Sequence, residues 1–328
     1  MWNYLLKLNK NLVTAIPVMM LAGFFFGVAF DTSLIAQLKM LIIPFTFMMV
    51  YPMMVTLNLK HLREGIKNVR LQTFTQVINF GLIPFLAYGL GRFFFADQPY
   101  LALGLLLAAL LPTSGMTISW TGFAKGNLGA AINMTVIGLT LGSLMTPFYV
   151  QLLLGAEVEV DIWLVIKQIV IIVFIPMLLG HLTRQSLLKK HGPEKFKKDL
   201  APRFPALSTV GVLGIVFVAI ALKAEQIFAN PGLVGTVFVP LLLLYLANFL
   251  LSTLVGKALF RRGDAIALVY GTVMRNLSIA LAIAMNAFGS QGADAALVIA
   301  LAYIIQVQSA AWYVRFTDRI FGPPPQSP

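Results

Sequence analysis

The sequence predicts an all-α integral membrane protein with ten transmembrane helices. Hydrophobic residues make up 59% of the 328-residue chain, charged residues make up 11%, and the mean hydropathy is +0.87. Soluble domains carry about 25% charged residues, so this composition cannot supply a water-exposed surface. Ten apolar runs follow one another along the chain, and each is close to the roughly 20 residues that span a hydrocarbon core.

The predicted spans are separated by short polar connections. They lie at 11–30, 33–58, 72–95, 100–123, 128–154, 162–183, 204–222, 232–256, 265–288 and 294–314. The run 11–30 follows Lys7 and Lys10, but it is too long for the apolar part of a signal peptide, so we interpret it as the first span. The Pro-rich segment 317–328 is predicted to be a disordered cytoplasmic tail.

Basic residues are concentrated at the termini and in the connections that follow even-numbered spans. These regions hold 19 of the 24 Lys and Arg residues, including those of the predicted solvated loop Lys189–Arg203. The opposite side has Lys223 and the acidic residues Glu157, Glu159 and Asp161. Cytoplasmic loops are enriched in Lys and Arg, so both termini are predicted to be cytoplasmic in a multi-pass protein of the plasma or inner membrane. The same rule explains the net charge of +12, so a nucleic-acid partner is not expected and membrane lipid is.

The number of spans suggests an internal duplication. Five spans per half is an odd number, so residues 1–160 and 161–316 would form two inverted five-helix repeats. The fourth span of each half contains a polar break, at Leu111–Thr117 in span four and at Tyr270–Asn276 in span nine. Proline and glycine weaken a helix, so both segments are expected to unwind and to form the transport site. The alternative is a pair of ordinary Pro/Gly kinks.

Arg275 lies in the middle of the apolar run Ala265–Phe288. A guanidinium at mid-bilayer depth costs roughly 2.5–3.5 kcal/mol on insertion scales, so it needs a partner. No carboxylate lies in a comparable run, which indicates that the partner is an anionic cargo. The alternative is a structural cation that binds exposed carbonyls at the C-terminal end of a broken helix.

Several segments, in their order and spacing, give the chain a resemblance to a known family. They are Met49–Met53, Asn79–Phe85, Pro112–Met116 with Trp120, Lys125–Asn127, Pro176–Arg184 and Asn276–Gly289. Together they resemble the bile acid–sodium symporter superfamily, and within it the arsenite efflux permeases. The resemblance implies a panel domain and a core domain, with crossed, broken helices 4 and 9 at the site. It also implies a secondary transporter that works by alternating access, and not an enzyme.

The chain departs from both branches of that superfamily at the implied site. Where arsenite permeases have a cysteine and two acids, this chain has Thr113, Ser278 and Gln306. A hydroxyl is a poor ligand for a soft metalloid, so metalloid efflux is kept only as an alternative. Where sodium symporters have Glu and Gln, this chain has Gly271 and Arg275, and a fixed cation repels sodium. Weak or no cation coupling is therefore expected, with sodium-coupled organic anion symport as a further alternative.

The candidate site consists of hydroxyls, amides and one guanidinium. The expected substrate-binding residues are Thr113, Ser114, Thr117, Ser119, Arg275, Asn276 and Ser278, and the candidate ion-binding residues are Asn133 and Thr135. Thr135 aligns with a threonine that resembles a sodium ligand of the bile acid symporters. For each hydroxyl the competing interpretation is a bond to the i−4 carbonyl, and for each Asn it is a bridge between helices. Gln306 and Gln308 are expected to join helices.

Other function classes lack the residues that they need. The sequence has no cysteine, no nucleotide-binding motif and no metal-binding or catalytic cluster around its three histidines, so no cofactor and no metal are expected. The predicted function is therefore a permease for a small anionic solute, either an organic anion or an oxyanion. An anion channel and a homodimer stay open as alternatives.

Overall fold

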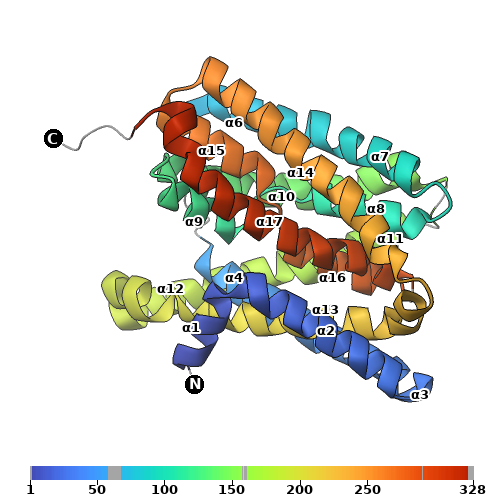
Figure 1. Cartoon of the computed structure of the whole chain (residues 1–328). Coiled ribbons are helices and arrows are strands. Elements are labelled where there is room, and N and C mark those ends of the chain that lie inside the picture. Colours follow the sequence, from blue (N-terminus) through green and yellow to red (C-terminus); the bar gives the residue numbers. More distant parts are fainter. Residues whose placement is uncertain (1, 58–67, 157, 159–160, 290, 324–328) are drawn as a thin grey trace.

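The computed structural model describes residues 2–57, 68–156, 158, 161–289 and 291–323, and it is built from helices (Figure 1). Seven helical segments are long and apolar enough to cross a membrane, and three shorter apolar helices accompany them. Within the described residues, β-type pairing is limited to one isolated bridge. The all-helical, membrane-spanning fold predicted from the composition is therefore confirmed.

The first half of the chain forms helices over the predicted spans and also an unpredicted helix, α1, before the first span. They are α1 (Trp2–Lys10), α2 (Leu12–Ala29), α3 (Thr32–Gln37), η1 (Leu38–Leu41), α4 (Ile42–Thr56), α6 (Val69–Gln76), η3 (Val77–Leu82), α7 (Ile83–Phe94), α8 (Pro99–Leu110), α9 (Gly115–Phe123) and α10 (Leu128–Leu154). The second half comprises α11 (Ile162–Ile169), η4 (Val170–Phe174), α12 (Ile175–Lys195), η5 (Phe196–Leu200), α13 (Arg203–Ala229), α14 (Gly232–Leu259), α15 (Arg262–Val273), α16 (Leu277–Ala287) and α17 (Gly292–Phe321).

Two predicted boundaries are wrong because helices continue into polar sequence. The segment Lys189–Arg203, predicted as a solvated loop, is mostly helical: α12 extends to Lys195 and η5 follows it. A kink at Gly192, whose φ of 75° suits glycine, turns the chain there. At the other end, α17 extends past residue 316 to Phe321. Residues 324–328 of the predicted tail lie outside the described residues, as do Lys60, Arg63, Lys67, Glu157 and Glu159.

Two long helices widen immediately before a proline. The π-helical turn η3 precedes Pro84, and η4 precedes Pro176. Proline has no N–H, so the carbonyl one turn earlier loses its helical partner, and a wider turn lets the chain pass this point without ending the helix. Both segments therefore continue as single, locally distorted spans.

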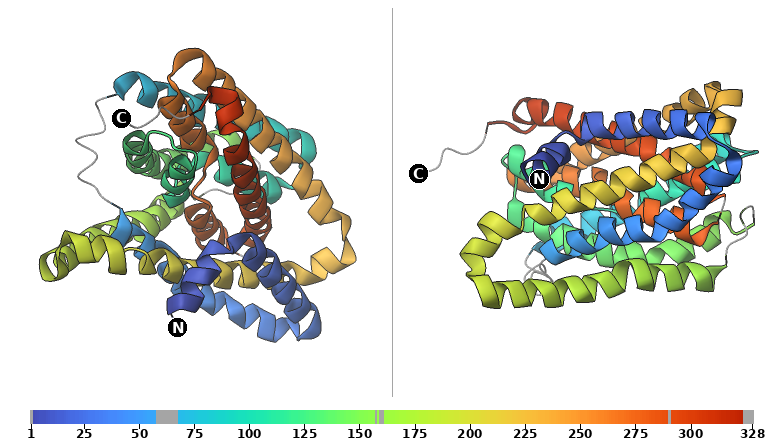
Figure 2. Two further views of the ribbon diagram at one scale, coloured as in Figure 1. Left: turned by 60° about the vertical axis from the view of Figure 1, so that its left-hand side comes forward. Right: turned by 90° about the horizontal axis from the view of Figure 1, so that it is seen from below.

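The helices gather in two groups (Figures 1 and 2). We call α1, α2, α4, α12 and α13 the panel group, because α13 packs against α2 and α4, and α12 packs against α4. We call α6 to α10 and α14 to α17 the core group, in which α17 packs against α8 and α16, and α14 packs against α15. Helix α11 contacts α10 and α16 of the core group, and η4 contacts α4 and α12 of the panel group as well as α16.

Small residues let the panel helices approach closely. A Cβ atom on Gly211 of α13 would lie 2.4 Å from the backbone nitrogen of Met49 in α4. One on Gly27 of α2 would lie 2.4 Å from the carbonyl oxygen of Ala221 in α13. Such contacts bring helix backbones together inside a membrane, where apolar burial against lipid gives little drive. The panel group is therefore a tightly packed unit.

The core group is fastened at one end by a shared carboxylate. Asp264, in the first turn of α15, accepts from Asn68 Nδ2 at 3.0 Å and from Asn127 Nδ2 at 2.7 Å. Asn68 and Asn127 are the N-caps of α6 and α10. A carboxylate is also favourable beside helix N-termini, because their free N–H groups carry partial positive charge. Three core helices are thus held to one another at this end.

Candidate functional site

The two predicted breaks are present, and they pair with each other. Helix α8 ends at Leu110 and α9 begins at Gly115, while α15 ends at Val273 and α16 begins at Leu277. Thr113 N donates to Met274 O at 2.7 Å, and Asn276 N donates to Leu111 O at 2.7 Å, so the extended segments form an antiparallel bridge. Unwound backbone at membrane depth needs such partners, and each break supplies them to the other.

Thr113 is held in a strained conformation that fastens the first break to α10. Its φ of 65° lies in the left-handed region, which a β-branched residue rarely adopts. Its hydroxyl lies within 3.3 Å of the carbonyl oxygens of Pro112, Met134 and Thr135. A Cβ atom on Gly138 would lie 2.5 Å from the Thr113 hydroxyl, so the glycine at this position of α10 leaves room for it. The fully buried Thr113 side chain is therefore committed to α10.

The helices that resume after the breaks have capped N-termini. Ser114 Oγ accepts from Met116 N at 3.2 Å, and Thr117 Oγ1 accepts from Ser114 N at 3.1 Å, which is a capping box on α9. Asn276 Oδ1 accepts from Ile279 N at 3.2 Å and caps α16. Asn276 and Ser114 are thus fixed at the start of the two half-helices.

Arg275 is enclosed within the core group. Its guanidinium Nη1 donates to the carbonyl oxygen of Ala109, in the last turn of α8, at 3.0 Å. The side chain is only 3% exposed, and its Nη2 has no hydrogen-bond partner among the described residues. The C-terminal end of a helix carries partial negative charge, which compensates part of the guanidinium charge. These contacts are the ones expected of a structural cation at a helix end.

Gln306 of α17 grips the peptide of Arg275. Its Oε1 accepts from Arg275 N at 2.7 Å and from Tyr245 OH at 2.9 Å, and its Nε2 donates to Arg275 O at 3.2 Å. The prediction that Gln306 joins helices is confirmed, because it ties the second break to α17 and α14. Gln308, two residues later, is exposed.

Side-chain amides also satisfy the last carbonyls of α15. Asn79 Nδ2 donates to Gly271 O at 3.0 Å, and Asn248 Nδ2 donates to Thr272 O at 2.9 Å. Helix ends leave their final carbonyls unpaired, and inside a membrane no water is present to fill that role. Helix α15 can therefore end in the protein interior.

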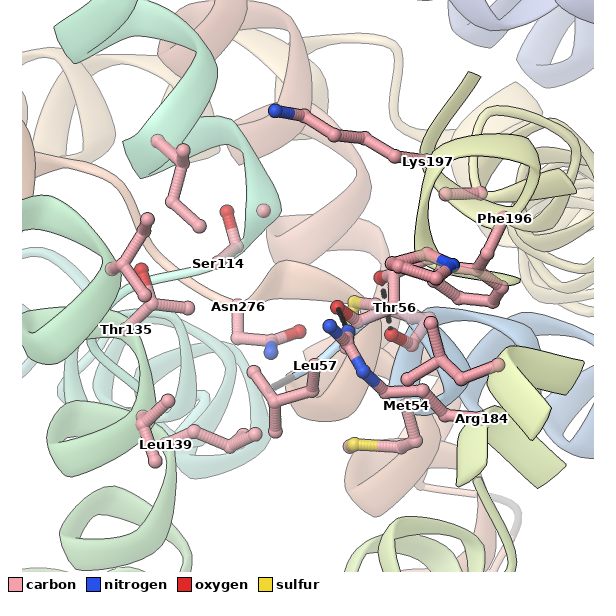
Figure 3. Close-up of a pocket in the computed structure, with 18 residues that line it drawn as sticks. Met54, Thr56, Leu57, Ser114, Thr135, Leu139, Arg184, Phe196, Lys197 and Asn276 are labelled. Carbon is pink, nitrogen blue, oxygen red and sulfur yellow. Dashed lines mark hydrogen bonds between the residues drawn. The ribbon is translucent and has the colours of Figure 1, made fainter. Parts of the chain in front are cut away.

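A cavity of about 400 Å³ lies between the two groups, beside the breaks (Figure 3). The core side consists of residues from the breaks and from α9 and α10: Ser114, Gly115, Ile118, Ile132, Thr135, Val136, Leu139 and Asn276. The panel side consists of residues from α4, α12 and η5, and of the residues that directly follow α4 and η5: Met53, Met54, Thr56, Leu57, Arg184, Leu188, Pro193, Phe196, Lys197 and Ala201.

The cavity wall is positively charged. Arg184 and Lys197 line it, and the described lining residues include no Asp or Glu. Arg184 Nη1 donates to Thr56 O at 2.8 Å, and the guanidinium carbon lies 5.3 Å from the centre of the Phe196 ring. The rest of the wall is mostly aliphatic and Met side chains. The arrangement suits a solute with a negative charge and an apolar body.

Only three of the predicted site residues line this cavity: Ser114, Asn276 and Thr135. The other six, which are Thr113, Thr117, Ser119, Asn133, Arg275 and Ser278, do not. Thr135 Oγ1 donates to Ala131 O at 2.8 Å and Ser119 Oγ donates to Gly115 O at 3.3 Å, both i−4 bonds. Ser278 Oγ lies 2.5 Å from Tyr303 OH of α17.

The sequence pattern does not identify the two cavity cations as site residues. Arg184 follows the predicted end of span six, and Lys197 lies in the predicted loop, so the pattern indicates only cytoplasmic charges. The overlooked signal is the lack of a helix-breaking residue between His181 and His191, which lets α12 carry Arg184 onward.

The sequence pattern of the sodium bile acid symporter family matches residues 42–230, which is more than half of the chain and includes both walls of the cavity except Asn276. The chain belongs to the sodium bile acid symporter family. It is therefore a membrane transporter and not an enzyme.

Three relatives show the range of this family. The chain is 31% identical over 213 residues to the uncharacterized protein YbaS of Bacillus subtilis, covering 64% of this chain and 67% of that protein. It is 26% identical over 299 residues to the arsenical-resistance protein Acr3 of Alkaliphilus metalliredigens, covering 87% and 83%. It is 25% identical over 185 residues to the sodium/bile acid cotransporter 7-B of Xenopus laevis, covering 53% and 51%. The names of these relatives span different cargoes, so the family alone does not fix the cargo of this member.

Proposed function

We propose that this protein is a secondary transporter that moves a small anionic solute by alternating access, with weak or no cation coupling. The observation that carries the proposal is the cavity. It touches both breaks, it lies between the panel group and the core group, and two cations line it without a carboxylate among its described residues.

Alternating access requires two units that move as bodies around a site. The panel group has close glycine contacts, and Asp264 fastens three core helices, so each group suits rigid movement. We assign residues 1–160 and 161–316 to two inverted five-helix repeats, because each half contributes one of the paired broken helices. We place the protein in the plasma or inner membrane with both termini cytoplasmic. In support, α1 and the C-terminal end of α17 lie at the same end of the molecule (Figures 1 and 2).

The alternatives with coupling or with a metalloid have less support. No carboxylate lines the described cavity wall that could bind sodium or carry a proton. The Thr135 hydroxyl is bonded to its own helix, and Asn133 does not line the cavity. Thr113, at the position of the cysteine in arsenite permeases, is buried against α10 and offers a hard oxygen to a soft element.

We assign the core-side contacts of the solute to Ser114 and Asn276. Arg275, Thr113 and Thr117 are positioning residues, because their side chains hold the breaks in place. Ser119 and Ser278 are placed outside the solute's contacts. Membrane lipid surrounds the exposed apolar helix faces.

Counterflow in proteoliposomes tests the proposal and separates a carrier from an anion channel. Vesicles preloaded with one unlabelled anion are offered the same anion in labelled form, using taurocholate, benzoate, phosphate and arsenite in turn. We expect saturable accumulation of at least one organic anion, with little change when a sodium or proton gradient is imposed at constant voltage. Flux without counterflow would indicate a channel, and a several-fold gain from the sodium gradient would overturn the uncoupled mechanism.

A further inference from the structure

Arg184 is the cavity cation with the most unused hydrogen-bonding capacity. A guanidinium has five N–H donors in a planar fork. The structure gives Arg184 one carbonyl, Thr56 O, and one aromatic ring, Phe196, and the described part of the chain offers it no carboxylate. We infer that Arg184, and not Arg275, binds the charged group of the solute, and that this group is a carboxylate or a similar planar anion. The inference rests on the proposed function.

The fixed orientation of Arg184 favours this role. The bond to Thr56 O and the cation–π contact with Phe196 restrain a side chain that would otherwise lose much rotamer freedom on binding. The chain turns at Gly192, and Phe196 of η5 is buried after this turn. Its ring therefore supports one side of the Arg184 guanidinium. A planar carboxylate accepts two parallel bonds from such a pre-set fork.

The residues around Arg184 indicate the chemistry of the rest of the solute. Met53, Met54, Ile118 and Leu139 offer an apolar wall to a hydrocarbon body, which an inorganic oxyanion lacks. Across the cavity, the core side offers the Ser114 hydroxyl and the Asn276 amide (Figure 3). An organic anion would therefore place its charge on the panel group and its polar contacts on the core group.

Lys197 contributes to anion attraction and less to binding. It is exposed on η5, with the exposed Glu194 and Lys198 beside it on the outer surface. Solvent and salt screen such a charge, so it attracts anions to the mouth of the cavity more than it binds them. Arg184 is half-buried, and its field is screened less.

The cavity charge can be measured without knowing the solute. The chain has no cysteine, so Leu57→Cys places a single thiol in the cavity, one residue from the carbonyl that binds Arg184. The readout is the ratio of its reaction rates with a sulfonated, negatively charged methanethiosulfonate and with a quaternary-ammonium one, each relative to free thiol. One cation at about 6 Å in water changes each rate about threefold in opposite directions, so Arg184→Gln should lower the ratio about tenfold.

The controls separate binding from folding. Arg184→Lys should keep most of the ratio, Lys197→Gln should lower it less, and Arg275→Gln should leave it within about twofold. An unchanged ratio in Arg184→Gln, or an equal fall in Arg275→Gln, would overturn the inference. Anion counterflow that persists with unchanged affinity in Arg184→Gln would also overturn it. Absence of anion counterflow in the wild type would instead defeat the proposed function.

A separate observation concerns the other end of the molecule. Lys223 of α13 and Asp294 of α17 form an ion pair, with Nζ and Oδ1 2.8 Å apart, and their side chains are 16% and 18% exposed. The pair joins the panel group to the core group. Lys223 lies 20 residues after Arg203 on α13, which is about 30 Å along the helix from the end that carries η5 and the cavity mouth. We propose that this pair is a latch that closes the far side of the transport path in the described conformation.

Cross-linking tests the latch directly. In the cysteine-free chain, Lys223→Cys with Asp294→Cys is treated with a short bifunctional thiol reagent that reductant can cleave. We expect the cross-link to keep a third cysteine at Leu57 unreactive toward a membrane-impermeant reagent added on the far side, and reductant to reverse this. Asp294→Asn should raise that reactivity several-fold, and exchanging the two charges, Lys223→Asp with Asp294→Lys, should lower it again. Far-side reactivity that ignores the cross-link would contradict the proposal.

Discussion

The two arginines near the cavity differ in what surrounds their charge. Arg275, in the core group, is enclosed, donates to Ala109 O at the end of α8, and has its peptide held by Gln306. Arg184, in the panel group, is half-buried, donates to Thr56 O, and faces a cavity without a described carboxylate. The sequence shows that an arginine lies inside an apolar run and that burying its charge is costly. It does not show which group offsets that cost. We therefore propose that the enclosed Arg275 serves the structure and that the half-buried Arg184 binds the solute.

The largest effect on stability is expected from Arg275→Gln. Losing a hydrogen bond from a charged group costs about 1.5–3 kcal/mol, and here the Ala109 carbonyl would also stay unpaired in the interior. We expect a lower free energy of unfolding in detergent and a lower folded yield, with the order of preference among anions unchanged in the protein that folds. A changed preference at unchanged stability would reverse the roles of the two arginines.

Gln306→Leu tests the structural role of the Arg275 region by removing the side chain that binds the Arg275 peptide. The substitution leaves Arg275 N and Tyr245 OH without their acceptor, and a buried unpaired polar group costs about 1–3 kcal/mol. Gln308→Leu is the matched control on the same helix, and because this side chain is exposed its effect should stay within about 0.5 kcal/mol. Thermal and denaturant unfolding of both variants check the prediction, and equal losses would contradict it.

A smaller effect separates two serines near the first break. Ser114→Ala removes a helix cap, for about 0.5–2 kcal/mol, and also a hydroxyl of the cavity wall, so both stability and solute affinity should fall. Ser119→Ala removes only an i−4 bond to Gly115 O, outside the cavity, and should leave counterflow within about twofold. Counterflow affinity measured for both variants would reject the assignment if Ser119→Ala were the more damaging change.

The sequence predicts the helices and breaks well because both depend on local chemistry. Apolar runs set the spans, and Pro112 and Gly115 lie at the break of the fourth span, whereas the break of the ninth span lies at 274–276, just after Gly271. It also identifies Gln306 as a link between helices. The hydrogen-bond partners of the two arginines cannot be predicted in this way, because they depend on which carbonyl lies beside each side chain in three dimensions. Ala109 O and Thr56 O are far from Arg275 and Arg184 in the sequence, so no local pattern shows that one arginine is enclosed at a helix end and that the other faces a cavity.

Only part of the cavity wall can be predicted from local sequence. Ser114 and Asn276 could be found from sequence because they flank the breaks, and Thr135 because the family resemblance aligns it with a threonine of the bile acid symporters. The panel side could not, since it depends on how α4 and α12 pack across the molecule. A helix that continues beyond the apolar run carries Arg184 into the wall, whereas a hydropathy pattern ends the span before it.

The comparison between the arginines is tested most directly by one pair of solutes. Inhibition of anion counterflow is measured with benzoate and with its neutral amide, benzamide, in the wild type, in Arg184→Gln and in Arg275→Gln. We expect Arg184→Gln to weaken the binding of benzoate about 10- to 100-fold, as for the loss of a charged hydrogen bond, and to leave the binding of benzamide almost unchanged. Arg275→Gln should change both inhibitors by the same small factor. A selective loss of benzoate in Arg275→Gln, with Arg184→Gln unaffected, would contradict the account.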